Sequence, residues 1–384
     1  MTKLTSETRA VRAGLESCDE TGAVVPPIHL SSTYAFKGFG DKRKYDYSRS
    51  GNPTRDLLAD ALTDLEGGAG TVITGSGMGA ITLVGHILPV GARVIAPHDC
   101  YGGTFRLLTA WKKRNELNVE FIDFGNAKAV DAALSKPAAL VWIETPSNPL
   151  LRITDIADIA KRSHAQGALV VADNTFLSPG WQQPLALGAD IVVHSTTKYI
   201  NGHSDVVGGA VIARTKELAE QLAWWGNCLG LTGSAFDSFL TLRGLRTLHV
   251  RLREHGRNAQ AVAEFLAGQS QVKRVYYPGL PGHPGHEVAK RQQTGFGAIV
   301  TIEVQGGLGG AQKFSEALEL FSLAESLGGV ESLVAHPGTM THAAMAPEAR
   351  AAAGLVDGLL RLSIGIESTE DLLRDLAAGV KALG

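Results

Sequence analysis

Short apolar runs of strand length alternate with amphipathic stretches of helix length along much of the chain. Alternation at this spacing predicts an α/β fold with a mostly parallel, doubly wound sheet, because parallel strands are joined by crossovers that are usually helices. Such sheets bind ligands beyond the carboxyl ends of their strands. The runs with strand character are residues 71–74, 94–96, 119–124, 139–143, 169–172 and 191–193.

The pattern changes near residue 248, where a long helix is expected over residues 249–266. Strand-like segments at 272–277, 298–304 and 359–366 alternate with helices after it, which is typical of a smaller α+β domain. The beginning of the chain is rich in hydroxyl residues and has no helical periodicity, so it is expected to be extended. We therefore predict an N-terminal arm over residues 1–53, a large domain over 54–247 and a C-terminal domain over 248–384.

Composition excludes several classes of protein. With 384 residues the chain exceeds the length at which one core stops growing, about 250 to 300 residues. Its 36 basic and 38 acidic side chains are well mixed, so we expect small-molecule partners rather than nucleic acid or a membrane. The N-terminus has no signal-peptide core, and no run approaches the roughly 18 apolar residues of a membrane span. A cytoplasmic protein is expected.

The cysteines and histidines do not form metal or disulfide patterns. Cys18, Cys100 and Cys228 are far apart and have no CxxC spacing, which argues against a disulfide framework or a thiolate zinc site. His336 and His342 have no acidic ligands in a regular pattern around them. We therefore expect no bound metal.

Lys198 follows the apolar run 191–193 and three hydroxyl residues, so it should lie just beyond the carboxyl end of a buried strand. A lysine in a poorly solvated site has a lowered pKa, and its free amine can form a Schiff base with a carbonyl. The hydroxyls of Ser195 and Thr197 are suited to a phosphate. Pyridoxal 5′-phosphate (PLP) carries both an aldehyde and a phosphate. The same stretch is also compatible with a surface lysine in a hydroxyl-rich loop.

A glycine-rich turn supplies a second phosphate signal. Residues 75–79, Gly-Ser-Gly-Met-Gly, lie between a strand-like run and a helical run from Ala80 to Leu88. Backbone N–H groups at a helix start face an anion, and glycines permit its close approach. Gly77 and Met78 are the candidate donors, although a single motif of this kind is weak evidence.

Three further residues follow strand-like runs and belong to the same predicted site. Asp173 would place a carboxylate at the sheet edge that carries Lys198, and a protonated pyridine nitrogen would satisfy its charge. Asn148 ends the preceding strand in the same way, and Tyr101 could stack on a planar ring.

Two arginines have alternative interpretations. Arg49 and Tyr47, near the end of the arm, could bind a phosphate, or could belong to a solvated turn before Asn52-Pro53. Arg361 alternates with apolar residues in the last strand, so it is either a solvated side chain or an anion clamp.

These residues, taken together, resemble the Cys/Met-metabolism family of PLP enzymes, which includes cystathionine γ-synthases, γ-lyases and β-lyases and methionine γ-lyases. The resemblance covers nearly the whole chain. It is carried by YSRSGNPTR, YGGTFR, ETPSNP, VADNTFLSP, DIVVHSTTKYINGHSDVVGG, FSLAESLGGVES and LRLSIGIE.

The resemblance implies an aspartate-aminotransferase-like fold of type I and a role for each candidate residue. Lys198 would bind the PLP aldehyde, Asp173 the pyridine nitrogen, and Tyr101 would stack on the ring. The α-carboxylate of the substrate would be bound by Arg361, Asn148 and Ser326. The phosphate would be held by Gly77, Met78, Ser195 and Thr197, with Tyr47 and Arg49 from a neighbouring subunit of a homotetramer built as a dimer of dimers.

The resemblance also favours one reaction, the γ-replacement of an O-acylhomoserine by cysteine. γ-Elimination of cystathionine is the alternative, and β-elimination ranks third because Glu325 resembles the γ-acting members. Ser50 stands where synthases that use O-succinylhomoserine carry an arginine, so O-acetylhomoserine competes with the favoured O-succinyl donor. Arg106 could supply positive charge near the substrate.

Two other classes of protein fit less of the sequence. Ser195-x-x-Lys198 matches the S-x-x-K of serine acyl-enzyme hydrolases, but that motif opens a helix and comes with S-D-N and K-T-G elements, which the sequence lacks. A protein that only binds PLP would have lost the lysine, the aspartate or the carboxylate clamp, and all three are present.

Overall fold

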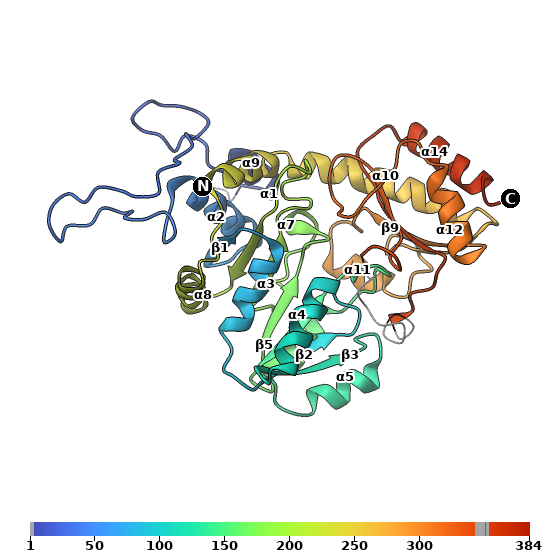
Figure 1. Ribbon diagram of the computed structural model, residues 1–384, viewed down its shortest axis with the longest axis horizontal. Coiled ribbons are helices and arrows are strands. Elements are labelled where there is room, and N and C mark those ends of the chain that lie inside the picture. Colours follow the sequence, from blue (N-terminus) through green and yellow to red (C-terminus); the bar gives the residue numbers. More distant parts are fainter. Residues whose placement is uncertain (1–3, 342–349, 351–352) are drawn as a thin grey trace. The chain divides into compact units, whose positions relative to one another are not determined.

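The computed structural model describes residues 4–341, 350 and 353–384. The chain forms two compact units (Figure 1). Unit 1 consists of Met1–Val90 and Leu169–His249, and unit 2 of Gly91–Ala168 and Val250–Gly384. The predicted division into arm, large domain and C-terminal domain stays a prediction. His342, one of the two histidines considered above, lies outside the described residues.

Among the residues of unit 1 that the structure describes, four strands lie in the order β1-β7-β6-β5. β5 and β6 are parallel, whereas β7 is antiparallel to both β6 and β1. Helix α3 packs on β6 and β7, and α2 packs on α9 and β1. The elements are α1 (Ser6–Arg12), α2 (Pro53–Glu66), β1 (Gly70–Thr74), α3 (Gly77–His86), β5 (Leu169–Asp173), α7 (Ser178–Trp181), β6 (Ile191–Ser195), β7 (Gly209–Ala213), α8 (Lys216–Leu229) and α9 (Ala235–Leu245).

Unit 2 contains a parallel group in the order β4-β2-β3 and a separate sheet in the order β10-β11-β12-β9-β8. The second sheet is antiparallel except between β10 and β11. The elements are β2 (Ala92–Pro97), α4 (Gly102–Lys113), β3 (Leu117–Ile122), α5 (Ala127–Leu134), β4 (Leu140–Glu144), α6 (Ile156–His164), α10 (Leu248–Ala267), β8 (Val272–Tyr276), α11 (His286–Gln292), β9 (Ile299–Val304), α12 (Gly307–Glu316), β10 (Ser322–Leu323), β11 (Leu333–Ala335), β12 (Leu359–Ser363) and α14 (Thr369–Lys381).

The first long helix shows how local sequence sets element boundaries. Asn52 caps α2 by accepting hydrogen bonds from the N–H groups of Thr54 and Arg55, and Pro53 occupies the first helical position. Gly67 ends the helix with a φ of 74°, a conformation that favours glycine. The helix start therefore lies at the end of the arm. The expectation that the arm is extended is wrong for its first part, because Ser6–Arg12 form helix α1.

The predicted α/β class is confirmed, and each strand-like run in the first half of the sequence is a strand in the structure. Sequence analysis missed β7, whose antiparallel pairing makes the strand group of unit 1 mixed rather than parallel. The strand predicted at 359–366 is also shorter, because β12 ends at Ser363.

Candidate active site

Lys198 lies in the turn that directly follows β6. Its N–H donates to the carbonyl of Ser195 at 3.3 Å, and its carbonyl accepts from the N–H of Gly202 at 2.8 Å. The residue is half-buried, and Ile191 to Val193 before it are fully buried. Lys198 is therefore not a fully solvated surface lysine, and no helix begins at Ser195 as an S-x-x-K hydrolase would require.

Asp173 is the last residue of β5 and pairs with Val193 of β6. One of its carboxylate oxygens accepts the N–H of Thr175 at 3.0 Å. Burial raises the pKa of Asp173 above its ordinary value, while hydrogen bonds from Thr175 and the charge of His194 oppose this rise. A carboxylate in such a place is stabilised when a cationic group is bound beside it.

The start of α3 forms the feature that we call the glycine cradle, made of residues 76–79 with Ser195 beside them. Ser76 caps the helix, since its hydroxyl accepts the N–H of Gly79 at 3.0 Å. The first backbone hydrogen bond of the helix is donated by the N–H of Ala80 to the carbonyl of Ser76. The N–H groups of Gly77 and Met78 come before that turn and are therefore oriented for an anion at the helix start.

Close neighbours require glycine at position 77 of the cradle and at position 209 beside it. A Cβ on Gly77 would lie 2.8 Å from the Cβ and 3.1 Å from the Oγ of Ser195. A Cβ on Gly209 would lie 2.2 Å from the carbonyl oxygen of Ser76. The structure therefore brings Ser195 against Gly77, as a shared phosphate site would require.

The two predicted hydroxyl ligands differ in their hydrogen bonds. The backbone N–H of Ser195 donates to the hydroxyl of Thr175 at 2.9 Å, and its own hydroxyl lies at the cradle. The hydroxyl of Thr197 donates to the carbonyl of Gly208 at 3.2 Å and accepts the N–H of Gly208 at 3.0 Å. Thr197 therefore holds the turn together in this structure.

The arginine cluster, Arg361 with Asn148 and Ser326, lies in unit 2. The guanidinium of Arg361 donates to the side-chain oxygen of Asn148 at 3.0 Å and to the carbonyl of Ser326 at 2.8 Å. Arg361 is only 3% exposed, so the alternative of a solvated side chain is wrong. Both neighbours were among the predicted site residues, and the structure brings all three together.

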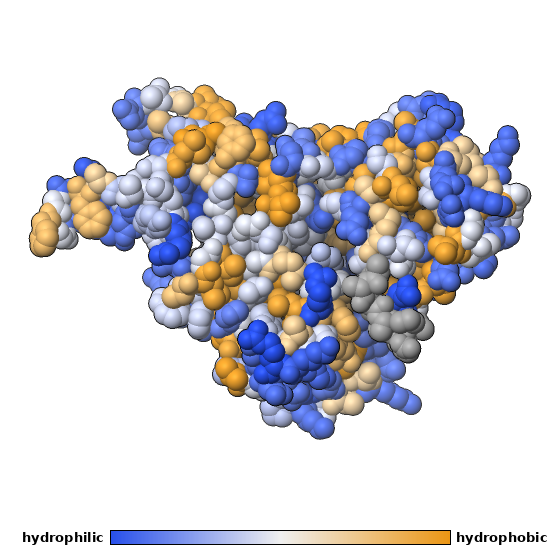
Figure 2. Space-filling model, viewed as in Figure 1, coloured by the Kyte–Doolittle hydropathy of each residue, from blue (hydrophilic) through white to orange (hydrophobic). Residues whose placement is uncertain are grey.

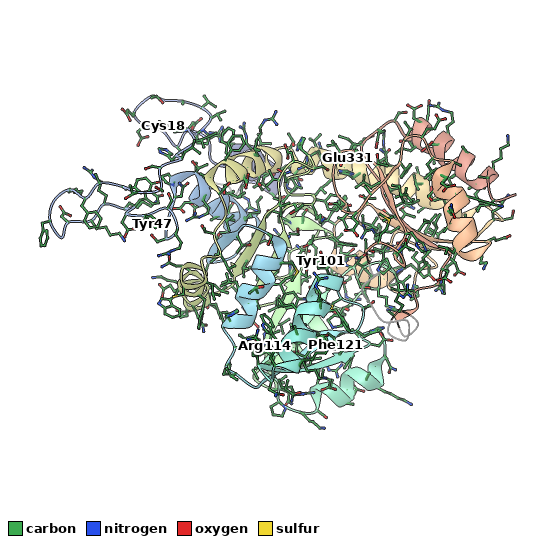
Figure 3. All side chains as sticks on the ribbon, viewed as in Figure 1. Cys18, Tyr47, Tyr101, Arg114, Phe121 and Glu331 are labelled. Carbon is green, nitrogen blue, oxygen red and sulfur yellow. The ribbon has the colours of Figure 1, made fainter. Side chains whose placement is uncertain are left out.

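The other predicted residues of unit 2 are more exposed. Tyr101 precedes α4, its N–H donates to the carboxylate of Glu144 at 2.7 Å, and its side chain is exposed (Figure 3). Arg106 is exposed on α4. Glu325 is exposed beside Ser326, which has a φ of 89°, an uncommon conformation for a residue with a side chain. Their predicted roles stay predictions.

Tyr47 lies on the arm, whose loops extend away from α2 and α9 of the same unit (Figures 1 and 3), and Arg49 follows it two residues later in the chain. The guanidinium of Arg49 lies 5.6 Å from the ring centre of Tyr47 and donates to the side-chain oxygen of Asn227 at 3.0 Å. Arg55 anchors this turn by donating to the carbonyl of Ser48 at 2.6 Å. The pair is thus presented on the surface of unit 1.

Sequence analysis missed Ser76 and Thr175. Ser76 could have been found as the helix cap between two glycines. Thr175 bonds Asp173 locally, but its hydroxyl accepts the N–H of Ser195 only because β5 and β6 are neighbours. Across residues 4–341, 350 and 353–384, no group of three or more His, Cys, Asp or Glu is arranged to hold a metal. No helix in the described part of the chain is long and apolar enough to cross a membrane.

The fold and these clusters define a PLP-dependent enzyme. The model of the Cys/Met metabolism PLP-dependent enzyme family matches residues 7–381, and the chain belongs to this family, as the sequence resemblance predicted. PLP is therefore its cofactor, and the groups present fit it: a lysine amine, a half-buried carboxylate with a raised pKa and a glycine cradle whose first N–H groups are oriented for an anion.

Individual relatives narrow the family to the cystathionine synthases and lyases. The chain is 56% identical to cystathionine γ-synthase of Escherichia coli over 98% of its own length and 97% of that protein. It is 46% identical to cystathionine γ-lyase of Dictyostelium discoideum, covering 96% of each. The crystal structure of cystathionine γ-synthase from Xanthomonas oryzae pv. oryzae in complex with aminoacrylate and cysteine matches with a TM-score of 0.98 and 60% identity, covering 100% of this chain and 99% of that chain.

Proposed function

We propose that the protein is a cystathionine γ-synthase, which replaces the acyl group of an O-acyl-L-homoserine with L-cysteine to give L-cystathionine. The observation that carries this proposal is the identity of 56% and 60% to two γ-synthases, which exceeds the 46% to a γ-lyase and to a β-lyase across nearly complete chains. A further γ-synthase, that of Mycobacterium tuberculosis, is 48% identical. Cystathionine γ-lyase is the alternative, because the two activities share a fold and a cofactor.

PLP would be held by the residues predicted from the sequence. Lys198 would bind its aldehyde, Asp173 its ring nitrogen, and Tyr101 would stack on its ring. Once bound, PLP supplies an electron sink that stabilises negative charge developing on the substrate. Its phosphate would accept hydrogen bonds from Gly77, Met78, Ser195 and Thr197, and from Tyr47 and Arg49 of a neighbouring subunit.

The arginine cluster would bind the α-carboxylate of the amino-acid substrate. Arg361 is buried, and the two oxygens that accept from it, on Asn148 and Ser326, are neutral. A substrate carboxylate would complete this site with a fork-shaped pair of charge-assisted hydrogen bonds. The substrate would then be oriented so that the amine of Lys198 can take the proton from Cα and return it farther along the chain, a role worth about 10² to 10⁴ in rate.

The acyl donor is proposed to be O-succinylhomoserine, with O-acetylhomoserine as the competing donor. In the arm, the hydroxyl of Ser50 donates to Asp46 at 2.9 Å and to the carbonyl of Tyr47 at 2.8 Å, so it serves its own turn. The positive charge that binds the carboxylate of the succinyl group would therefore come from another residue, such as the exposed Arg106. Glu325 would lie near the γ-substituent of the substrate.

A homotetramer is proposed, in which the arm (residues 1–53) reaches a second copy. The arm has little core of its own, and its apolar side chains, orange in Figure 2, are exposed to solvent. Contact with another subunit would bury them and would bring Tyr47 and Arg49 to its phosphate site. In the described part of the arm, the exposed large apolar residues other than Tyr47 are Leu4, Val11, Val24, Val25, Leu30, Phe36 and Phe39.

Product identification tests the proposed reaction. PLP-loaded protein is given an O-acylhomoserine with and without cysteine, and a parallel sample contains cystathionine alone. We expect cystathionine to be formed only in the sample that contains both the O-acylhomoserine and cysteine. Consumption of cystathionine to cysteine, 2-oxobutanoate and ammonia, with negligible synthesis, would instead establish the γ-lyase, and release of pyruvate would establish a β-lyase.

A further inference from the structure

A second polar cluster lies in unit 2 beneath the loop that carries Asn148. Asp99, just after β2, has a side chain that is only 8% exposed. One of its carboxylate oxygens accepts from the guanidinium of Arg152 at 2.7 Å and from the hydroxyl of Ser147 at 2.7 Å. A buried carboxylate is costly unless it is paired and hydrogen-bonded, so these contacts fix the positions of both partners.

Those partners are the two ends of a closed loop. The N–H of Ser147 donates to the carbonyl of Arg152 at 3.0 Å, and the N–H of Arg152 donates back to the hydroxyl of Ser147 at 3.3 Å. The N–H of Leu151 also donates to the carbonyl of Ser147 at 3.0 Å. Asn148 therefore belongs to a small ring whose base is held by Asp99.

The opposite side of the loop is held by the sheet that carries Arg361. The side-chain oxygen of Asn148 accepts from Arg361, and the carbonyl of Pro149 accepts from the hydroxyl of Thr301 at 2.6 Å. Thr301 and Arg361 are paired neighbours on β9 and β12. The loop thus connects the buried Asp99 to the guanidinium of Arg361 through one short run of residues.

We propose that the ion pair of Asp99 and Arg152 is a positioning element for the binding of the amino-acid carboxylate. It fixes the loop so that the side-chain oxygen of Asn148 orients the guanidinium of Arg361. Arg152 also donates to the carbonyl of Ala353 at 3.0 Å, which holds its planar group in place from the other side. This inference rests on the proposed role of Arg361 in the function above, and it assigns Asp99 and Arg152 no contact with the substrate.

The test measures carboxylate binding directly. Holoenzyme is titrated with glycine, an α-amino acid without a leaving group, and with methylamine, which has the amine and lacks the carboxylate. The absorbance of the bound cofactor reports both. We expect Asp99→Asn to raise the dissociation constant of glycine about tenfold, as loss of a hydrogen bond to a charged group does, while methylamine binding stays unchanged.

Glu120→Gln is the matched control. Glu120 pairs with Arg93 between β3 and β2 of the same unit, and Arg93 donates in turn to the carbonyls of Ala133 and Lys136 rather than to the loop that carries Asn148. This variant also removes one charge from an arginine pair, and it should bind glycine like the wild type. Equal effects of Asp99→Asn and Glu120→Gln on glycine, or equal effects of Asp99→Asn on glycine and methylamine, would overturn the proposal.

A double-mutant cycle tests whether the effect passes through Asn148. If it does, Asp99→Asn changes glycine affinity little in an Asn148→Ala background, because the group that it positions is already gone. If the double variant instead raises the dissociation constant of glycine by the product of the two single-variant factors, the two residues act independently and the mechanism is contradicted. If Asp99→Asn does not fold, Ser147→Ala removes one hydrogen bond to Asp99 and is expected to weaken glycine binding in the same way, with methylamine binding unchanged. Since glycine binding does not depend on the reaction catalysed, failure of the γ-synthase assignment appears separately in the product assay.

Discussion

Substitution of Gly77 by alanine tests the glycine cradle at a single methyl group. Gly77 is the first residue of α3, and the new Cβ would lie 2.8 Å from the Cβ of Ser195. Carbon atoms in good contact are about 3.5 Å apart, so the helix start and the strand must separate by about 0.7 Å. The atoms that the methyl group meets are close to the backbone of β6, so a simple side-chain rotation does not relieve the contact.

A shift of this size is enough to break a hydrogen bond to the phosphate. A bond of about 2.9 Å would lengthen to about 3.6 Å, beyond the usual range for N–H to O. Hydrogen bonds to charged groups are worth about 1.5 to 3 kcal/mol, so Gly77→Ala should weaken PLP binding about 10- to 150-fold. The dissociation constant is measured by titrating the apoprotein with PLP and following the absorbance of the bound cofactor.

Gly79→Ala is the control on the same helix. Its Cβ would meet Thr74 at 3.4 Å and Ser76 at 3.5 Å, which are ordinary contacts. Alanine also has the better helix propensity, by up to about 1 kcal/mol, so this variant should retain PLP affinity and should not melt at a lower temperature. If Gly77→Ala binds PLP as tightly as Gly79→Ala does, the phosphate does not lie at the start of α3 and the proposal for this site is wrong.

Three other parts of the proposed site give predictions of their own. Arg361→Lys cannot donate to two oxygens and a carboxylate in the same geometry, so kcat/KM for an acylhomoserine should fall about 10- to 100-fold in steady-state assays; an unchanged value would exclude the carboxylate role. Burial raises the pKa of Asp173, so the folded apoprotein keeps a proton that the unfolded chain releases near pH 4, and its free energy of unfolding should fall with rising pH through that window. Urea unfolding at several pH values should lose this dependence in Asp173→Asn. Subunits with Arg49→Ala and subunits with Lys198→Ala should each be nearly inactive, and mixed oligomers reassembled from them should regain activity; no recovery would show that the arm does not serve a neighbour.

Local sequence is enough to place the residues of the strand ends. Ile191 to Val193 and Leu169 to Ala172 are short apolar runs with turn residues after them, so the local pattern alone assigns Lys198 and Asp173 to the ends of buried strands. The strand β7 was missed because it begins at a glycine pair, Gly208 before it and Gly209 as its first residue, and because its pairing partners, β1 and β6, lie on two separate parts of the chain. Pairing of this kind is not encoded in a local pattern.

The environment of Arg361 depends on contacts that sequence patterns do not contain. The alternation of residues in β12 is compatible with either a solvated or a buried Arg361. Its side chain is buried because Asn148 and the carbonyl of Ser326, which come from distant loops, bind its guanidinium. The same limit applies to Asp99 and Arg152, which match no motif and meet only because the loop after β4 folds back on the end of β2. Their pairing becomes visible only in three dimensions.

The most direct test of γ-replacement is the ratio of cystathionine to 2-oxobutanoate formed from an O-acylhomoserine as cysteine is increased. Both products arise after the acyl group has left, so a γ-synthase partitions one pool of substrate between them. We predict that 2-oxobutanoate falls toward zero as cystathionine rises to saturation. If release of 2-oxobutanoate continues unchanged at saturating cysteine and little cystathionine forms, the enzyme eliminates rather than replaces, and the account of its function is contradicted.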